Sequence, residues 1–386
     1  MSRVAFTLDG RAVHAEAGET ILDVARREGV EIPHLCWTPG LAPAGNCRAC
    51  MVEVEGERTL AASCCRQPSD GMQVSSASER ARASQRLVLE LLQADLPETV
   101  YTRHNEVDQW SAKLGVGKPR FAPRAQPAAD VSHPAIAVHL DACIQCTRCL
   151  RACRDEQAND VIGLALRGAH AKIVFDMDDP MGASTCVACG ECVQACPTGA
   201  LAPAHGAAMA ASDREVASLC PYCGVGCQLT FHVKDDRITH VQGRHGPANE
   251  GRLCVKGRYG FDYPRHPQRL KVPLIRREGV PKDALGTLDA KDVMKVFREA
   301  TWEEALALGG GTLRRIRDTH GAKALAGFGS AKGSNEEAYL FQKLVRLGFG
   351  SNNVDHCTGL CQASSVASLL EGLGSGAVSN PVMDVT

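Results

Sequence analysis

Cysteine is the residue type whose number and spacing in this chain could do chemistry. The 386 residues include 19 cysteines, and the amino-terminal sequence has no apolar stretch of the kind that directs export. In a reducing cytoplasm, clustered cysteines bind metals or carry electrons more often than they form disulfides. Sixteen of the 19 fall into four runs. The runs are Cys36, Cys47, Cys50 and Cys64; Cys143, Cys146, Cys149 and Cys153; Cys186, Cys189, Cys192 and Cys196; and Cys220, Cys223, Cys227 and Cys254.

The first run has the pattern C-x10-C-x2-C-x13-C, and its first three cysteines lie in a Gly/Pro-rich loop. Such a loop can direct backbone N–H groups at the sulfurs of a cluster. A structural zinc ion usually takes two close pairs, whereas Cys36 stands alone. The spacing therefore predicts a [2Fe–2S] site. Cys65 adjoins Cys64 and could be the ligand in its place.

The second and third runs repeat one pattern, C-x2-C-x2-C-x3-C, which marks an internal duplication. In two-cluster ferredoxins the fourth cysteine of each run binds the other cluster. Zinc has no use for three cysteines at successive steps of three, twice over. We therefore predict two [4Fe–4S] clusters. One is held by Cys143, Cys146, Cys149 and Cys196, and the other by Cys186, Cys189, Cys192 and Cys153.

The fourth run has the pattern C-x2-C-x3-C-x26-C. The alternating apolar residues of Gln228–Gly243 predict a hairpin that brings Cys254 back to the first three cysteines. From spacing alone, a [4Fe–4S] site and a zinc ribbon both stay open. Cys65 and Cys357 are outside the runs, and we expect them to be buried small residues.

Strand and helix patterns surround the first run. The chain predicts strands over Val4–Leu8 and Arg11–Ala15, a helix over Ile21–Glu28 capped by Thr20, and a strand from Met51. A second helix is expected over 79–96, opened by a capping box that begins at Ser76 and carrying the apolar residues Leu87 and Leu91. The Pro/Ala-rich residues 118–130 predict a linker.

The last third of the chain predicts the start of an α/β unit. Thr301 caps a helix through about Asp318, Ala324–Phe328 is a short apolar strand, and Ser334 caps a helix over Asn335–Leu347. The segment Gly327–Gly333 is a poor dinucleotide fingerprint because its third glycine comes one residue late. It predicts either a turn that admits a phosphate-bearing cofactor at a helix N-terminus or a plain tight turn.

Composition excludes two classes of partner. Lys and Arg total 43 and Asp and Glu total 44, so the net charge is -1, and a nucleic-acid binder would carry a basic excess. No apolar run approaches the roughly 18 residues of a membrane span. We expect a cytoplasmic protein without a membrane span.

The chain resembles the N-terminal portion of the catalytic subunit of cytoplasmic NAD-dependent formate dehydrogenases that contain molybdenum or tungsten. The order of the runs supports the resemblance, and four segments carry it in detail. They are Leu140–Cys149, Ser184–Gly199, Cys220–Arg258 and Asn352–Val366. The resemblance implies a [4Fe–4S] cluster for the fourth run and a bis-molybdopterin guanine dinucleotide cofactor in the full-length protein.

The implied fold class is multi-domain α+β. The expected parts are a β-grasp [2Fe–2S] ferredoxin domain at 1–78, a helix and linker at 79–130, a 2x[4Fe–4S] ferredoxin-like module at 131–210, a molybdopterin oxidoreductase [4Fe–4S] domain at 211–270, and the start of a molybdopterin-binding α/β domain at 271–386. The chain stops at Thr386, so we expect a fragment or one piece of a split subunit, inactive by itself.

The resemblance also implies roles for single residues. Cys361 falls at the position of the metal-binding Cys or selenocysteine, and a thiolate suits such a centre. Lys256, two residues after the last cysteine of the fourth run, falls between cluster and pterin. Gln362 stands where relatives carry a catalytic His, and Gly359 stands where a basic residue is expected.

The implied activity is formate oxidation to CO2. The implied partners are flavin- and NAD-binding diaphorase subunits with iron–sulfur clusters, which receive the electrons. Because Gln cannot take up a proton near neutral pH, a molybdoenzyme with another substrate stays open. So does a non-catalytic electron-relay subunit of the hydrogenase or complex I type.

Overall fold

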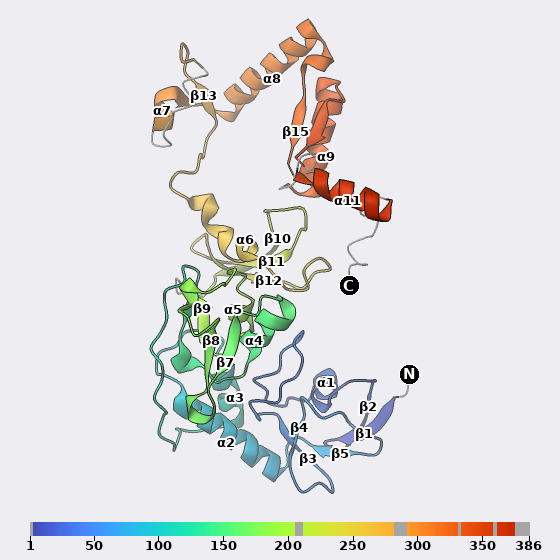
Figure 1. Ribbon diagram of the computed structural model, residues 1–386, viewed down its shortest axis with the longest axis vertical. Helices are drawn as coiled ribbons and strands as arrows, with labels where there is room; N and C mark the ends of the chain where they lie inside the picture. Colours follow the sequence, from blue (N-terminus) through green and yellow to red (C-terminus); the bar gives the residue numbers. More distant parts are fainter. Residues whose placement is uncertain (1–2, 205–210, 282–291, 331–332, 358–360, 375–386) are drawn as a thin grey trace. The chain divides into compact units, whose positions relative to one another are not determined.

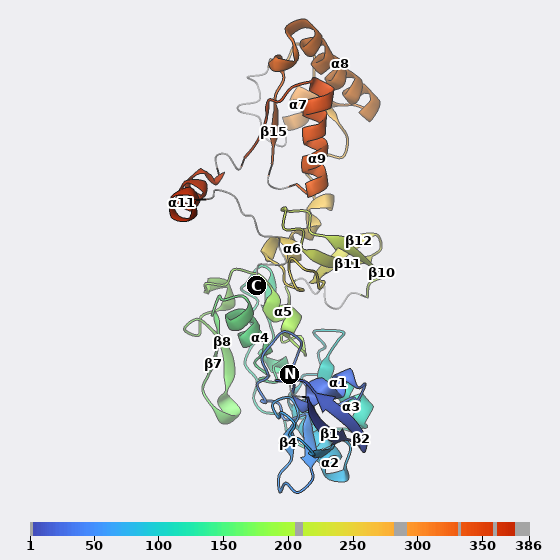
Figure 2. The ribbon, with the colours of Figure 1, turned by 90° about the vertical axis from the view of Figure 1, so that its right-hand side faces the viewer.

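The computed structural model describes residues 3–204, 211–281, 292–330, 333–357 and 361–374. Figures 1 and 2 show two views of the ribbon, coloured from blue at the N-terminus to red at the C-terminus. The chain divides into two compact units. The first unit comprises Met1–Arg214, His232–His240 and Leu253–Arg258, and the second comprises Glu215–Phe231, Val241–Arg252 and Tyr259–Thr386.

The first unit begins with a five-stranded mixed sheet. Its order is β2 (Arg11–Ala15), β1 (Val4–Leu8), β5 (Gln73–Ser75), β3 (Met51–Val54) and β4 (Ala61–Ala62). The predicted β1–β2 hairpin is confirmed, with Val4 opposite Ala15. Asp9 and Gly10 both have positive φ, 49° and 78°, as a two-residue hairpin turn requires. β5 joins β1 in parallel and β3 antiparallel.

Helix α1 (Ile21–Arg27) lies beside this sheet and begins as predicted at Thr20. The Thr20 hydroxyl accepts from the Asp23 N–H, and the Asp23 carboxylate accepts from the Thr20 N–H in return. This reciprocal cap satisfies two otherwise unpaired donors at the helix start. Leu22 and Val24 are fully buried in the core below the sheet.

The predicted second helix is confirmed as α2 (Glu79–Asp95), but its predicted cap is wrong. Ser78 is the N-cap and accepts from the Ala81 N–H. The Ser76 hydroxyl instead donates to the Asp9 carboxylate at 2.6 Å, because Ser76 still belongs to the turn that follows β5.

The buried face of α2 also differs from the prediction. Leu87 and Leu91 are 42% and 44% exposed, whereas Gln85 and Leu89 are fully buried. Leu89 packs with residues of the first cysteine loop and of α3 (Glu106–Leu114), a helix that the sequence analysis missed. The helix thus supports the cysteine loop from outside the sheet.

The predicted linker has no helix or strand between residues 118 and 129, but ion pairs hold it along α2. Arg120 forms a two-pronged pair with Glu90, at 2.7 Å for both contacts. Arg124 pairs with Asp95 at 3.2 Å. The segment is therefore attached to α2 and is not a flexible linker.

The duplicated cysteine runs lie in a small module of two hairpin-like pairs. Strand β6 (Ile136–Val138) pairs with β9 (Leu201–Pro203), and β7 (Ile162–Ala165) pairs with β8 (Lys172–Phe175), both antiparallel. Each run continues into a short helix. These helices are α4 (Arg148–Arg151), which passes into a π-helical turn at Ala152–Glu156, and α5 (Glu191–Ala195).

The predicted hairpin between the third and fourth cysteines of the last run is confirmed. Strands β11 (Gln228–Lys234) and β12 (Arg237–Gly243) form a three-stranded sheet with β10 (Arg214–Leu219). Asp235 and Asp236 both have positive φ at the hairpin turn. Helix α6 (Val255–Tyr259) follows Cys254 directly.

The remaining elements belong to the second unit. They are β13 (Leu274–Arg276), antiparallel to β14 (Phe297–Glu299), then α7 (Val293–Val296), α8 (Trp302–His320), β15 (Gly327–Gly329), α9 (Asn335–Lys343), β16 (Val354–His356) and α11 (Ala363–Leu373). Thr301 and Ser334 cap α8 and α9 as predicted. The predicted strand starts later, because Ala322–Ala324 forms a 3-10 turn. Helix α9 continues as a π-helical turn, Leu344–Phe349.

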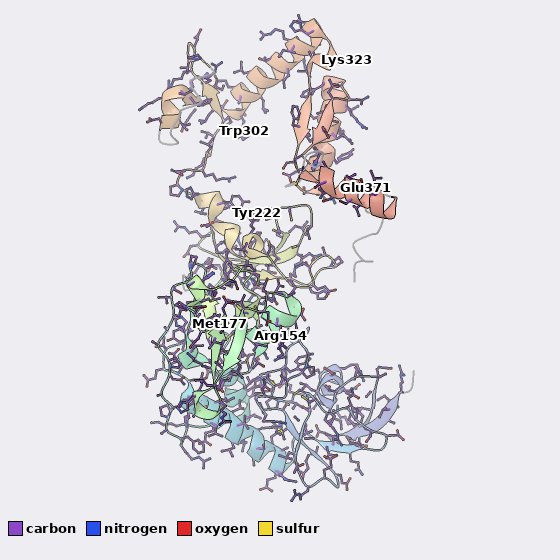
Figure 3. All side chains as sticks on the ribbon, in the orientation of Figure 1. Arg154, Met177, Tyr222, Trp302, Lys323 and Glu371 are labelled. Atoms are coloured by element: carbon purple, nitrogen blue, oxygen red, sulfur yellow. The ribbon has the colours of Figure 1, made fainter. Side chains whose placement is uncertain are left out.

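The helices of the second unit keep much of their apolar surface exposed. Trp302 at the start of α8 is 65% exposed, and Figure 3 shows its side chain. Leu347 is 75% exposed. None of the helices in the described segments combines the length and the apolar character that a membrane crossing requires.

Candidate functional site

The loops around β3 bring the first cysteine run together. Cys36, Cys50 and Cys64 are buried and Cys47 is half-buried. Hydrogen bonds from the Cys47 and Cys64 thiols lower the pKa of Cys36, and the N–H groups of Cys47 and Asn46 lower it further. A hydrogen bond from Cys64 lowers the pKa of Cys50 to about 7. The four thiols therefore form one hydrogen-bonded group.

Cys65 lies outside this group. It is exposed, and its Sγ lies 3.6 Å from the Sγ of buried Cys64. The chain turns here, with the Cys65 N–H donating to the Ala62 carbonyl, so the two neighbouring side chains lie in different surroundings. The prediction that Cys65 is buried is wrong, and the geometry favours Cys64 as the ligand.

The duplicated module contains two small cavities, and each is lined by four cysteines. The first has Cys143, Cys146, Cys149 and Cys196 in its wall. The second has Cys153, Cys186, Cys189 and Cys192. In both cavities the fourth cysteine comes from the other run, which is the crossed grouping that the sequence predicts. That these sulfurs bind iron stays a prediction.

The backbone of the two runs has the same unusual conformation at equivalent positions. Gln145 and Thr147 have positive φ, and so do Ala188 and Gly190. Alternating left-handed residues turn successive N–H groups toward one side of a loop, as at many iron–sulfur sites. The duplication is therefore visible in the backbone as well as in the sequence.

Apolar side chains complete both cavities, and this sets the chemistry of the thiols. Ile173 and Leu201 line the first cavity, and Phe175 and Met181 line the second. Burial raises the pKa of Cys146 to about 12. A deprotonated sulfur is therefore costly here unless a positive centre binds it.

The donor sets of the two cavities consist of four cysteines each. Four cysteine thiolates are the usual ligands of a [4Fe–4S] cluster, so these sets fit such clusters. No group of three or more His, Cys, Asp or Glu side chains that could hold a metal ion was found among the described residues.

The fourth run is divided between the two units. Cys220, Cys223 and Cys227 belong to the second unit, where the Cys220 N–H donates to the Cys227 carbonyl at 2.8 Å. Cys254 belongs to the first unit, and a joint site with the other three stays a prediction. Lys256 is exposed on α6.

The segment with Cys361 follows a parallel strand pair. β15 and β16 pair in parallel, with Gly327 opposite Val354. The glycine turn follows β15, and the segment with Cys361 follows β16, so both leave the carboxyl edge of this pair. Such an edge is where open α/β sheets bind ligands.

A cavity of about 790 Å³ lies at this edge, lined by Gly329, Ser330, Gly333, Asp355 and His356 among others. Its volume is in the range of cofactor pockets. At the adjoining N-terminus of α9, the Ser334 N–H donates to the Glu337 carboxylate and the Glu337 N–H donates to the Ser334 hydroxyl, so these two donors are already paired. The position and the volume of the cavity fit a cofactor.

Cys361 and Gln362 are both exposed at the start of α11, and Gln362 is its N-cap. The Cys361 N–H donates to the Cys357 carbonyl at 3.0 Å. Cys357 is exposed, so the prediction that it is buried is wrong; it follows β16 into the loop beyond the sheet. Gly359 lies outside the described residues.

The sequence analysis missed a set of buried and half-buried polar side chains around the cysteine runs. The amide of half-buried Asn249 donates to the carbonyls of Gln228 and Arg252, which ties the base of the hairpin to the segment before Cys254. Arg148, Arg151 and Arg258 are buried as well. No sequence signal separates these arginines from the exposed ones of short helices.

Comparisons with known proteins agree with this layout. Residues 1–79 match a 2Fe-2S iron-sulfur cluster binding domain, and residues 133–202 match the ferredoxin-like domain of NADH-quinone oxidoreductase subunit 3. Residues 213–266 match the molybdopterin oxidoreductase Fe4S4 domain, and residues 269–386 match the molybdopterin oxidoreductase domain. The chain thus matches iron–sulfur and molybdopterin oxidoreductase domains over these residues. These domains indicate iron–sulfur clusters and a molybdenum cofactor.

The curated relatives that the chain matches are longer than it is. A Staphylococcus haemolyticus protein provisionally named a formate dehydrogenase is 29% identical over 98% of this chain and 41% of its own length. The Bacillus subtilis protein YjgC, provisionally named an oxidoreductase, is 30% identical with the same coverage. The chain thus spans about 41% of the length of the relatives it matches.

Among solved structures, the chain is similar to a crystal structure of an NAD+-reducing [NiFe]-hydrogenase. The identity is 29%, the TM-score is 0.49, and the similarity covers 52% of this chain and 87% of the other.

Proposed function

We propose that this chain is the electron-transfer and cofactor-binding part of a formate dehydrogenase-type molybdoenzyme. The observation that carries the proposal is the carboxyl edge of β15 and β16, where the glycine turn and the segment with Cys361 leave the sheet beside a large cavity. The provisional name of the Staphylococcus haemolyticus relative supports formate as the substrate.

In this proposal the sixteen cysteines of the four runs hold one [2Fe–2S] and three [4Fe–4S] clusters. When bound, such clusters take up and release single electrons, and a molybdenum or tungsten centre exchanges two with a substrate. The chain's own residues bury or half-bury the cysteines of the first three runs, whereas Cys223 and Cys254 of the fourth run are exposed. Because burial raises the pKa of Cys143 to about 11, cluster binding must release protons from thiols such as this one.

We assign roles to three further residues. Cys361 is the thiolate ligand of the molybdenum or tungsten ion. Gln362, beside it at the start of α11, orients substrate without exchanging a proton. Lys256 on α6 lies two residues after Cys254 and approaches the pterin in the loaded enzyme.

The electrons leave toward partner subunits that bind flavin and NAD and carry iron–sulfur clusters of their own. The match of residues 133–202 to a domain named for NADH-quinone oxidoreductase supports a nicotinamide-linked partner. We place the complex in the cytoplasm, where NAD is available.

The test is formate-dependent reduction of a redox dye by the full-length protein purified without oxygen. We expect about one molybdenum or tungsten per subunit, and we expect Cys361→Ala to lose at least a hundredfold in rate. The exposed thiol of Cys357 supplies the matched control, because Cys357→Ala removes a sulfur four residues away. Full activity in Cys361→Ala would refute the ligand assignment.

A second candidate is a molybdoenzyme that acts on another substrate. Gln362 and Gly359 favour it, since neither supplies the acid–base group or the charge expected for formate. A metal-loaded protein that is inactive with formate would favour this candidate. A protein with iron and no molybdenum or tungsten would favour an electron-relay subunit.

A further inference from the structure

We propose that Arg151 and Arg258 are positioning residues that tie neighbouring iron–sulfur clusters together and raise their reduction potentials. The inference rests on the proposed cluster ligation. Both arginines are buried, 6% and 4% exposed. Arg151 bonds to residues of the first and second cysteine runs, whereas Arg258 follows the last cysteine of the fourth run and bonds to the third. They therefore lie at two of the three junctions in the predicted chain of four clusters.

Arg258 lies on α6, four residues after Cys254. Its Nε donates to the Cys189 carbonyl at 2.8 Å, and one Nη donates to the Gln194 side chain at 2.8 Å. The other Nη donates to the Glu191 carboxylate at 3.1 Å. All three acceptors belong to the third cysteine run. One side chain thus fixes the segment with Cys254 against that run.

Arg151 makes the equivalent connection at the other junction. One Nη donates to the Cys36 carbonyl at 2.5 Å and to the Cys146 carbonyl at 3.3 Å. The other Nη donates to the Ala42 carbonyl. The first and second runs are therefore held together through a single guanidinium. Its planar fork allows this, whereas an ammonium group has no fixed geometry.

A neighbouring arginine reinforces this junction. Arg148 forms a two-pronged pair with Glu106, at 2.6 and 2.8 Å, and donates to the Trp37 carbonyl. Within the described part of the chain, the Nε atoms of Arg148 and Arg151 are buried and make no hydrogen bond. A buried donor without an acceptor is costly, so a cluster sulfur would be a favourable neighbour for either group.

Charge gives these arginines an effect on potential as well as on position. Arg258 donates to the Cys189 carbonyl at 2.8 Å, so its positive charge lies beside a cysteine of the third run. A positive charge held there favours the extra electron of a reduced cluster. Glu191 opposes this effect. Removing Arg258 alone would therefore leave a buried carboxylate near the same cysteines.

The test is an EPR-monitored redox titration of the full-length protein with its clusters. In Arg258→Gln, we expect the reduction equilibrium of one [4Fe–4S] cluster to shift at least tenfold toward the oxidised form, which is 59 mV for one electron. The double variant Arg258→Gln/Glu191→Gln should regain most of this shift. Arg151→Gln should act on the clusters of the first two runs instead.

Arg154 supplies the matched control. It is 51% exposed, adjoins Cys153 and is labelled in Figure 3. Because solvent screens its charge, Arg154→Gln should change each reduction equilibrium by less than twofold. Arg258→Lys keeps the charge but not the three bonds, so it should keep the potential and weaken the magnetic coupling between clusters.

Three results would overturn the proposal. One is an Arg258→Gln protein with full iron content and every reduction equilibrium within twofold of the parent. Another is an effect of Arg154→Gln as large as that of Arg258→Gln. If the Arg258→Gln protein loses its clusters, the Arg258→Lys protein is the test. Magnetic coupling between clusters that is unchanged in Arg258→Lys would refute the positioning role. Shifted potentials without formate activity would contradict only the proposed substrate, whereas a protein that binds no iron would contradict the ligation itself.

Discussion

Neighbouring cysteines in one turn can have opposite chemistry, and Cys64 and Cys65 are such a pair. Cys64 is fully buried and hydrogen bonded within the first group, whereas Cys65 is exposed. A cluster ligand must be a thiolate whose position is held by its surroundings. Of the two, only Cys64 is held in place by buried surroundings, so the two residues should differ sharply when replaced.

We expect Cys64→Ala to lose the visible absorption and the EPR signal of the [2Fe–2S] cluster, and Cys65→Ala to keep both. The pair is its own control, since both changes remove one thiol from the same turn. The measurement is EPR of the reduced protein together with its iron content. A [2Fe–2S] signal that survives in Cys64→Ala but not in Cys65→Ala would reverse the assignment.

At the scale of elements, α2 is attached to the sheet through a polar residue in its buried face. Gln85 is fully buried and donates to the Met51 carbonyl at 2.9 Å and to the Ser76 carbonyl at 3.1 Å. The helix that supports the first cysteine loop is therefore fixed to β3 by direction-specific bonds as well as by packing.

Replacing Gln85 with Leu leaves two carbonyls without their donor in a dry environment. Each lost bond costs about 0.5–1.5 kcal/mol net, so we expect the free energy of unfolding to fall by about 2 kcal/mol. Urea unfolding, followed through the absorption of the first cluster, measures this. Gln67→Leu is the control, because Gln67 is exposed and makes one contact of 3.5 Å. Equal urea midpoints for Gln85→Leu and Gln67→Leu would contradict the role of Gln85 in attaching α2 to the sheet.

At the scale of the molecule, the two units differ in what stabilises them. The first unit contains a continuous core of buried residues together with three of the cysteine runs. The second unit has few fully buried side chains among its described residues, and α8 and α9 contain none. We expect metal binding at these cysteines to add to the stability that the core gives the first unit.

Without iron and sulfide, we expect the first unit to lose cooperative melting. A structural zinc ion contributes about 10–16 kcal/mol in small domains, comparable to the whole net stability of about 5–15 kcal/mol. Calorimetry of chelator-treated protein, with iron and sulfide added back to one portion and zinc to another, measures the effect. Native circular dichroism and a cooperative transition in the iron-free sample would contradict it.

The sequence by itself determined the cysteine groups and the local elements. Spacing predicted the first four thiols, the crossed sets of the duplicated runs, the β1–β2 hairpin and the cap at Thr20, because each depends on residues close in sequence or on a repeated pattern. Only the tertiary structure decided that Ser78 and not Ser76 caps α2, and that Leu89 and not Leu87 is buried.

The same distinction explains the arginines. No sequence pattern marks Arg258 as a buried side chain. The residues that accept its hydrogen bonds lie 64 to 69 positions away in the sequence. Burial of a charge depends on which distant carbonyls and carboxylates the fold brings to it, because an unpaired charge would not be tolerated there. The sequence could therefore predict the ligands of the clusters, whereas the groups that hold one cysteine run against the next emerged only with the folded chain.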